Sequence, residues 1–498
     1  MENHFNLVDE TWIPVSGVGR VSLSQIFSNP DYRALGGNPV QKIAMMKLLL
    51  AIAQAAAMPA DDEEWRALGA DGLADKCLVY LQKWHDRFYL YGEKPFLQML
   101  AIASTAVQPF GAVQPQIAVG NKTVLTQWQV ERTLENADKA LLLIVLMGFA
   151  LGGKNTDNRV TLSPGYAGKL NEKGKPSSGK PGPAVAHKGL LHSLLMGETI
   201  RQSLWLNLIT QQQLNSNRHF PLGLGSPPWE EMPAGEDCRV ARALKGSLIG
   251  RLVPLCRFCL LLEDGLHYSE GVAHSSYKEG RCDPTVAVNW SGKEPKALWC
   301  NPEKRPWREL TALLSFLSQQ QSGGFECQQL QIGVQRAANA VEHFVLWSGG
   351  LGVSSNAGEQ YVSGIDDFLE SRLEIHSAAL GDLWFAQLQL EMMALDELAK
   401  ALYVRVFGYF KVQLVDSKLM AAHATQIFWQ LCERDCQQLI DSCKPDDASQ
   451  KARRQLRRRF ASYAQQAYDQ HCPKETARQL DAWAKCRPNF SKYLNQEV

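Results

Sequence analysis

Residues 384–409 read WFAQLQLEMMALDELAKALYVRVFGY, a stretch in which apolar side chains recur at helical spacing. From about residue 373 onward glycine nearly disappears, and the same spacing returns at residues 418–443, 448–471 and 474–483. Apolar residues at i, i+3, i+4 and i+7 form one face of an amphipathic helix. Four such helices joined by short polar links predict an antiparallel helical bundle over residues 373–498.

The part of the chain before the bundle mixes strand and helix patterns. Residues 5–23 alternate apolar and polar side chains around two glycines, which predicts two short strands joined by a turn. Helical spacing follows over residues 39–84, with a break near Pro59. Residues 247–263 are compatible with a central strand, and residues 330–347 show helical spacing. These patterns predict an α+β fold, with a large mixed domain over residues 1–372 followed by a four-helix bundle over residues 373–498.

Length and composition limit the class of protein. A chain of 498 residues is long enough for several domains with large cores, and its net charge of +1 excludes a histone-like basic binder. The 12 cysteines lack disulfide-type spacing, and no charged-then-apolar leader is evident, so we expect a reducing cytoplasm. The longest apolar segments, residues 43–58 and 140–151, are shorter than the roughly 20 residues of a membrane helix. We expect them to be buried helices and expect no membrane association.

Residues 152–189 form a glycine- and lysine-rich stretch between two apolar segments. The stretch carries seven basic residues and only two acidic ones, Asp157 and Glu172. Local positive charge attracts phosphate, and glycine allows the main chain to approach a groove closely. The stretch predicts either a loop that contacts nucleic acid or a surface insertion without a core of its own.

Catalytic and metal-binding patterns are weak. Cys256 and Cys259 have the internal spacing of a zinc ligand pair but lie in an apolar run, which favours a buried strand. Asp366 and Asp367 are adjacent acids that fit a solvated helix start better than a metal site. The sequence shows no nucleophile elbow, HExxH helix or phosphate-binding loop. We therefore expect no enzyme activity, no metal and no cofactor.

Two further segments each allow two interpretations. The glycine pair at 349–350 and the polar residues 354–360 fit either a close approach to a nucleic-acid groove or a helix-capping loop. The basic run at residues 451–460 places Arg454, Arg457 and Arg458 at i, i+3, i+4 spacing. That face fits either a phosphate backbone or a solvated bundle surface.

Residues 6–15 (NLVDETWIPV) and 94–98 (KPFLQ) resemble markers of the large subunit, the CasA family, of the type I-E CRISPR surveillance complex Cascade. Residues 197–210, the glycine pair at 349–350 and the closing helical bundle follow in the order of that family. The resemblance therefore extends over essentially the whole chain.

The resemblance implies a non-catalytic subunit of an RNA-guided antiviral complex. Such a subunit recognises the protospacer-adjacent motif of duplex DNA, promotes strand opening and R-loop formation, and helps to recruit a helicase-nuclease. Its implied partners are the other Cascade subunits, the CRISPR guide RNA, double-stranded target DNA and the recruited helicase-nuclease.

The resemblance also implies positions for the contacts. The glycine loop falls at Gly179, Lys180, Gly182 and Lys188, a second lysine at Lys278, and a wedge at Ser355, Asn356 and Ala357. Contact with the guide's 5′ handle or with other subunits falls at Leu125, Thr126, Gln127 and Trp128. This chain departs from the family because its glycines are dispersed rather than consecutive, and because it lacks the cysteine-rich zinc element that some relatives carry.

Two other functions remain open from the sequence. A metal-dependent nuclease with an unrecognised site would depend on Asp366 and Asp367. An assembly scaffold would leave the glycine- and lysine-rich stretch without a role in DNA binding.

Overall fold

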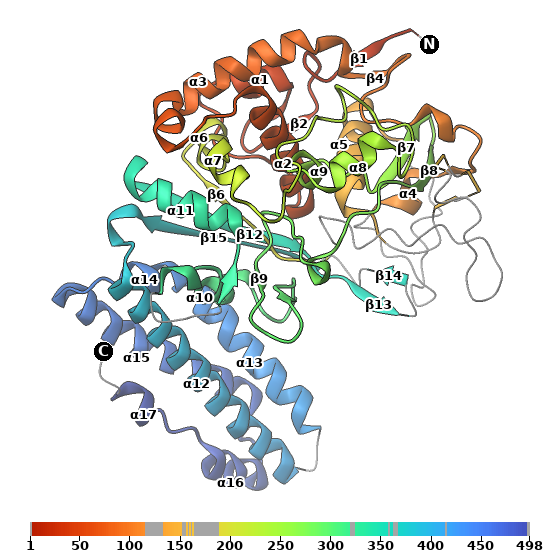
Figure 1. Ribbon diagram of the computed structural model, residues 1–498. Coiled ribbons are helices and arrows are strands. Elements are labelled where there is room, and N and C mark those ends of the chain that lie inside the picture. Colours follow the sequence, from red (N-terminus) through yellow and green to blue (C-terminus); the bar gives the residue numbers. More distant parts are fainter. Residues whose placement is uncertain are drawn as a thin grey trace. The chain divides into compact units, whose positions relative to one another are not determined.

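The fold is seen in a computed structural model that describes residues 2–495 except 115–132, 152–155, 158, 161, 164–188, 319–323, 357–358, 362–366 and 414–415. Side chains are not described over residues 354–366. Helices alternate with small antiparallel sheets along the chain, so the predicted α+β fold class is confirmed (Figure 1). The chain divides into two compact units. Unit 1 comprises Met1–Pro306 and Gly323–Arg372, and unit 2 comprises Trp307–Ser322 and Leu373–Val498.

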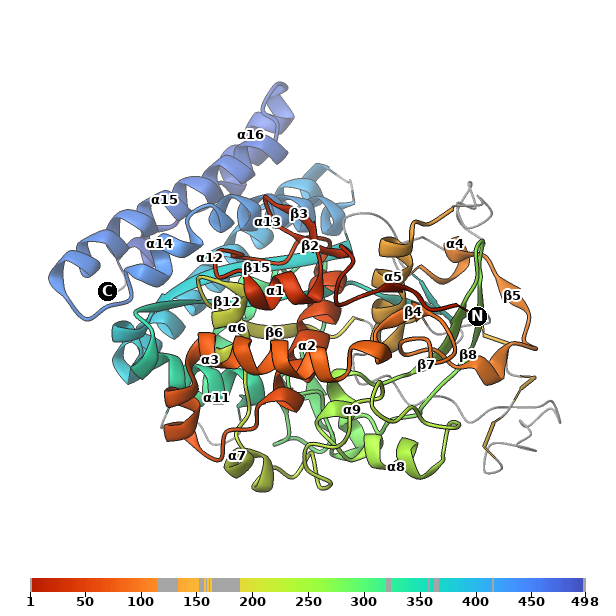
Figure 2. The ribbon, with the colours of Figure 1, turned by 90° about the horizontal axis from the view of Figure 1, so that it is seen from above.

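Unit 1 is organised around helix α2 (Pro39–Ala56), which packs on α3 (Asp62–Lys83) and α5 (Asn136–Phe149) (Figure 2). A capping box between Asn38 and Gln41, with proline at the first helical position, fixes where α2 begins. The two apolar segments expected to be buried helices lie in α2 and α5, and nearly all of their side chains are buried. None of the helices that the structure describes is long and apolar enough to cross a membrane.

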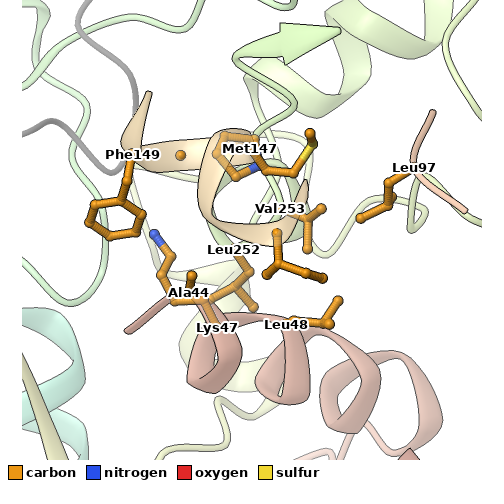
Figure 3. A pocket seen from close by; sticks show the side chains of 11 residues that line it. Ala44, Lys47, Leu48, Leu97, Met147, Phe149, Leu252 and Val253 are labelled. Carbon is orange, nitrogen blue, oxygen red and sulfur yellow. The ribbon is translucent and has the colours of Figure 1, made fainter. Parts of the chain in front are cut away.

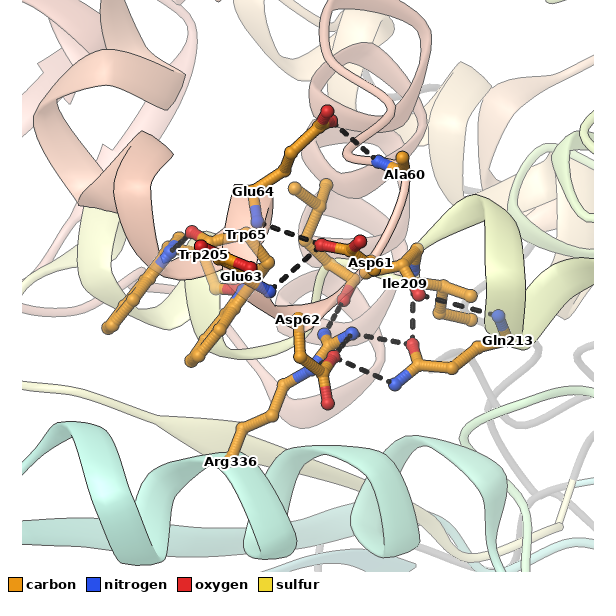
Figure 4. A network of polar contacts seen from close by, with 12 residues as sticks. Ala60, Asp61, Asp62, Glu63, Glu64, Trp65, Trp205, Ile209, Gln213 and Arg336 are labelled. Carbon is orange, nitrogen blue, oxygen red and sulfur yellow. Dashed lines mark hydrogen bonds and ion pairs between the residues drawn. The ribbon is translucent and has the colours of Figure 1, made fainter.

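A polar and aromatic cluster joins the start of α3 to α6 (Ile200–Leu206) and α11 (Gln328–Ala340) (Figure 4). The rings of Trp65 and Trp205 stack with centroids 4.2 Å apart, and each indole N–H donates to the other residue's carbonyl. The guanidinium of Arg336 lies over the Trp65 ring and donates to the carboxylate of Asp62 and the amide oxygen of Gln213. The buried Arg336 of α11 thus binds α3 and α7 (Gln211–Asn215) through contacts far apart in the sequence.

The sheets of unit 1 are short. β2 (Ile13–Val15) and β3 (Gly19–Val21) form the predicted N-terminal hairpin, while β1 (His4–Asn6) pairs with β4 (Tyr89–Tyr91). Three further sheets have the orders β5-β8-β7, β10-β9-β11 and β15-β12-β6. Their strands are β5 (Val107–Gln108), β6 (His192–Met196), β7 (Arg257–Leu261), β8 (Leu266–Glu270), β9 (Val288–Asn289), β10 (Lys296–Ala297), β11 (Phe325–Glu326), β12 (His343–Leu351) and β15 (Phe368–His376).

Two elements differ from the sequence prediction. Residues 330–347 are not one helix, because α11 ends at Ala340 and strand β12 begins at His343. Residues 247–263 are not one strand, because helix α9 (Ile249–Leu252) precedes β7. Both segments are apolar at many positions, and such runs carry little periodicity that separates a buried strand from a buried helix.

The helices of unit 2 are α12 (Asp382–Gln413), α13 (Ser417–Glu433), α14 (Cys436–Asp441), α15 (Asp447–His471), α16 (Ala477–Cys486) and α17 (Ser491–Leu494). α12, α13 and α15 pack on one another, and α16 packs on α12. The segment Trp307–Ser322, expected in the mixed domain, belongs to this unit and contributes α10 (Leu310–Leu313). Its Arg308 guanidinium lies 3.7 Å from the centroid of the Trp429 ring in α13, which explains the assignment.

The basic run of α15 does not form one exposed face. The Arg457 guanidinium makes a two-pronged ion pair with Glu391 of α12, with both N–O distances 2.9 Å, and both side chains are buried. Arg453 is buried beside them, whereas Arg454 and Arg458 are exposed. Neither interpretation of this face holds for Arg457, which stabilises the interior of the bundle.

Candidate nucleic-acid interface

Only some of the predicted contact residues lie where the structure describes the chain. Gly179, Lys180, Gly182 and Lys188 of the glycine loop lie outside the described residues, as do Leu125, Thr126, Gln127, Trp128 and Ala357. Those assignments stay predictions. Lys278 is described in full, and Ser355 and Asn356 by their backbone.

Lys278 lies on the 3₁₀ helix η4 (Tyr277–Glu279). A reciprocal capping box between Ser276 and Glu279 begins this turn, and Gly280, with φ of 82°, ends it in the left-handed region. The Lys278 side chain is exposed, and it forms no salt bridge with another described residue. Lys278 therefore presents an available positive charge on a fixed turn.

Ser355 and Asn356 lie on strand β13 (Ser354–Asn356), which pairs with β14 (Glu359–Tyr361) in a hairpin (Figure 1). Ser354 is opposite Tyr361, Ser355 opposite Gln360, and Asn356 opposite Glu359. The helix-capping loop considered from the sequence is therefore wrong here. Ser355 and Asn356 of the predicted wedge therefore lie on the first strand of this hairpin.

The glycine- and lysine-rich stretch ends at Gly189, which the structure does describe. Gly189 has φ of 81°, and its carbonyl accepts a hydrogen bond of 2.6 Å from the amide of Cys300. A Cβ placed on Gly189 would lie 3.4 Å from Cε3 of Trp299 and 3.6 Å from Cβ of Val353. The residue that ends the stretch therefore approaches both Trp299 and the residue that precedes β13.

Trp299 also contacts η4. The rings of Tyr277 and Trp299 meet edge to face with centroids 6.4 Å apart, and Leu190 forms an antiparallel bridge with Trp299. Trp299 is thus a neighbour of Gly189 and of the turn that carries Lys278, and Gly189 in turn approaches Val353, which precedes β13. The structure therefore brings these three segments close together around Gly189 and Trp299.

Sequence reasoning missed Trp299. Residues 297–300 are all apolar, so the sequence shows no alternation that would separate an exposed residue from buried ones. In the structure Leu298 and Cys300 are buried at 8 % exposure each, whereas Trp299 between them is 43 % exposed. The sequence does not indicate that Gly189, Tyr277 and Val353 meet there.

The charge around Trp299 is mixed and weakly positive. Lys293 and Lys296, in and beside the turn between β9 and β10, are exposed like Lys278. Burial raises the pKa of Tyr277, and the nearby carboxylate of Glu294 adds to that shift. These three lysines slightly outweigh the negative charges of Glu279 and Glu294, so the local charge, like that of the whole chain, is weakly positive.

A buried ion pair lies shortly after the Lys278 turn in the sequence. Lys47 of α2 donates to Asp283, whose carboxylate also accepts from the amide and hydroxyl of Thr285, and that hydroxyl contacts Nδ1 of His192. Lys47 lines a cavity of about 10 Å³ together with Ala44, Leu48 and Phe149. Figure 3 shows these side chains around the cavity. The pair fixes the segment that follows η4 onto α2.

The described residues offer no metal site. Cys256 and Cys259 are almost fully buried, and burial raises the pKa of Cys259 to about 12, which keeps it a thiol. Within the described ranges no group of three or more His, Cys, Asp or Glu side chains is placed to hold a metal ion. Asp366, half of the acidic pair considered for a nuclease, lies outside those ranges.

A family model described as CRISPR-associated protein Cse1 matches residues 6–467. The chain belongs to the Cse1 family. The resemblance to the CasA family stated from the sequence is thereby confirmed. A CasA/Cse1 protein of Thermus thermophilus is 27% identical over 337 residues, which cover 62% of this Cse1 chain. The match spans 60% of the length of that relative.

Solved structures share the fold of this Cse1 chain. Thermus thermophilus CasA gives a TM-score of 0.75 at 20% identity, over 98% of this chain and 99% of that one. Thermobifida fusca Cse1 gives a TM-score of 0.75 at 18% identity, over 97% of this chain and 95% of that one. A chain of a CRISPR RNA-guided surveillance complex gives a TM-score of 0.67 at 13% identity, over 98% of this chain and 99% of that one. These identities are low, so the likeness concerns the fold alone.

Proposed function

We propose that this Cse1 family member is a non-catalytic subunit of an RNA-guided surveillance complex, and that it recognises the protospacer-adjacent motif in duplex DNA. In this proposal it then promotes strand opening and R-loop formation, and helps to recruit a helicase-nuclease. Its partners are the other subunits, the guide RNA and the target DNA. Family membership and the likeness to a chain of a surveillance complex support the proposal.

The observation that carries the proposal is the convergence at Trp299. Gly189, Tyr277 and Val353 are distant in the sequence and all contact or approach this side chain or its immediate neighbour. Each adjoins a predicted DNA contact, namely the glycine loop, Lys278 and the hairpin with Asn356. The proximity of three candidate contact segments that are far apart in the sequence supports a shared role in binding.

Groove chemistry fits this assignment. Minor-groove edges distinguish A·T from G·C pairs and little else, so small residues and one amide read a short motif while base pairing with the guide reads the remaining sequence. Separating a base step costs a few kcal/mol, which phosphate contacts and guide pairing must offset. A chain of net charge +1 needs the other subunits for that purpose.

Charge reversal tests the proposal. Lys278→Glu, and separately Lys180→Glu with Lys188→Glu, should weaken duplex binding by the full complex and flatten its salt dependence, by a slope of about 0.9 per lost phosphate contact. Lys76→Glu is the matched control, because Lys76 is also exposed but lies on α3. Unchanged binding by both variants in an intact complex would favour an assembly scaffold instead.

The hairpin has its own test. Asn356→Ala should slow strand opening more than it affects assembly with guide RNA, measured by the fluorescence of a reporter base in the target strand. Equal opening rates for variant and parent would remove the wedge from the mechanism. Magnesium-dependent cleavage that is lost on changing Asp366 and Asp367 would instead establish a nuclease.

A further inference from the structure

We propose that Trp299, with Tyr277 beside it, is a stacking site for an unpaired nucleobase next to the DNA interface. The inference rests on the proposed function, because it assumes that nucleic acid reaches this surface. It adds a ligand class to that surface, namely a base that is not in a duplex.

The first reason is exposure in a fixed position. Trp299 keeps 43 % of its surface accessible, although its neighbours Leu298 and Cys300 are buried. Single exposed apolar residues are common on protein surfaces and require no explanation alone. Trp299 differs because its backbone is bridged to Leu190, its ring meets Tyr277 edge to face, and Gly189 approaches its six-membered ring.

The second reason is the support beneath the ring. Tyr277 packs on a buried cluster made of Leu190, Cys282, Val286, Val288 and Ala297. This cluster supports Tyr277 from below, and Tyr277 supports Trp299. An aromatic ring held in this way loses little conformational freedom when a flat ligand stacks on it.

The third reason is charge. Lys278 follows Tyr277 directly in the sequence, and Lys293 and Lys296 shortly precede Trp299. All three lysines are exposed, and none has a salt bridge to another described residue. Sites for single-stranded nucleic acid combine cations that follow the backbone with aromatic rings on which bases stack. Stacking of this kind accepts any base, since every base has a flat face.

The position gives the site a use. The β13–β14 hairpin starts at Ser354, next to Val353, and Val353 lies at the Gly189 and Trp299 contact. A base released where the hairpin enters the duplex would therefore emerge near Trp299. Stacking there would delay re-pairing of the released base.

The test uses the full chain assembled with guide RNA and the other subunits, and three DNA probes of the same sequence that do not pair with the guide: a paired duplex, a duplex with a short mismatch bubble, and a single strand. We expect Trp299→Ala to weaken binding of the bubble and the single strand by roughly 5- to 150-fold, which is the range for loss of one stacked base. Binding of the paired duplex should change less than about twofold, and Trp299→Phe should retain most of the affinity. Val79→Ala, at a 73 % exposed residue of α3, is the control.

A spectroscopic measurement separates stacking from support of the fold. With 2-aminopurine at the unpaired position, the parent and Trp299→Phe should quench its emission on binding, and Trp299→Ala should not. Equal losses on all three probes, or no loss with Trp299→Ala, would overturn the inference. The same holds if the parent binds none of the probes, which would also remove the proposed function. Alternatively, the parent binds the bubble and quenches its 2-aminopurine emission through Trp299 without binding the paired duplex. In that case the inference stands and the proposed recognition of duplex DNA is refuted.

Discussion

Replacing Lys47 with methionine should destabilise unit 1 by about 3–5 kcal/mol at neutral pH. The Lys47 and Asp283 side chains are 2% and 1% exposed, and Lys47 donates directly to the carboxylate. Methionine retains most of the aliphatic stem but leaves Asp283 as a buried carboxylate that accepts hydrogen bonds from Thr285 alone among the described residues. Loss of one partner of a buried pair is costly because the remaining charge has no counter-charge.

The pH dependence distinguishes this charge effect from simple loss of packing. Burial by itself raises the pKa of Asp283, but attraction by Lys47 and His192 and hydrogen bonds from Lys47 and Thr285 lower it below its ordinary value of 3.8. A depressed carboxyl pKa contributes stability above the pKa of the unfolded chain, and that stability is lost as pH falls through the folded-state pKa. In Lys47→Met the raising effect of burial is no longer opposed by Lys47, so the Asp283 pKa should rise. The cost of the substitution should then be largest near pH 7 and should shrink as the pH approaches about 4, where a proton neutralises Asp283.

Hydrogen exchange of the α2 amides, corrected for intrinsic rates at each pH, measures this cost without requiring the whole chain to unfold in one step. Lys42→Met is the matched control on the same helix, because its ion pair with Glu370 at 2.7 Å is 19% and 24% exposed and should contribute about 1 kcal/mol or less. Lys47→Met with Asp283→Asn should recover part of the loss. A cost for Lys47→Met below about 1 kcal/mol, or one that does not change with pH, would refute the reasoning.

Three further predictions follow from buried contacts. Glu391→Gln should cost unit 2 about 3–5 kcal/mol, measured by urea unfolding of the bundle, because it removes the anion from the buried Arg457; a cost below about 1 kcal/mol would contradict this. Gly350→Ala should destabilise β12 by about 1–3 kcal/mol, since its Cβ would lie 2.9 Å from the carbonyl oxygen of Leu190, whereas Gly72→Ala within α3 should stabilise slightly; equal thermal shifts would contradict this. Burial lowers the pKa of His274 from 6.5 to about 3, so its neutral form contributes stability that is complete above pH 6.5 and declines as pH falls toward 3; His274→Asn should flatten that decline in acid unfolding curves.

Helices were the most predictable part of the fold because their signals are local. Asn38 before Pro39, and Asp61 before the acidic first turn of α3, place the helix starts through side chains that are close in the sequence. The bundle helices show apolar periodicity over many turns, which a single substitution does not obscure. Their boundaries in the structure lie within a few residues of the predicted ones, apart from the division of the second helix into α13 and α14.

Strand β12 could not be predicted because it is buried on both faces. From Leu346 to Leu351 every residue is buried, so the strand lacks the alternation that identifies a half-exposed strand. Its pairing with β6 joins Trp347 to Leu194 and Gly349 to His192, contacts between residues far apart along the chain. Periodicity within a short window carries no information about such partners.

The candidate interface was predictable in its parts but not in its centre. Lys278, Asn356 and the glycine loop came from the resemblance to a family and from local composition. Neither source indicated Trp299. Its importance depends on its contacts with Gly189 and Tyr277 and on the approach of Gly189 to Val353, and these residues are far apart along the chain. Long-range convergence of this kind is a property of the folded chain.

The glycine pair of β12 shows how the interface depends on the layer beneath it. The sequence suggested that Gly349 and Gly350 approach a nucleic-acid groove, but both are buried. A Cβ on Gly349 would lie 2.8 Å from the Leu369 carbonyl oxygen, and one on Gly350 would lie 2.5 Å from Sγ of Cys300. The missing side chains therefore let the segments of Leu190 and Cys300 lie against β12, and those two residues flank the Gly189–Trp299 contact. If the proposed interface binds DNA, these small residues contribute to it indirectly, because they allow the segments beside Trp299 to lie against β12. Gly350→Ala should then weaken bubble binding as well as stability, whereas Gly72→Ala should affect neither binding nor the position of the Trp299 ring.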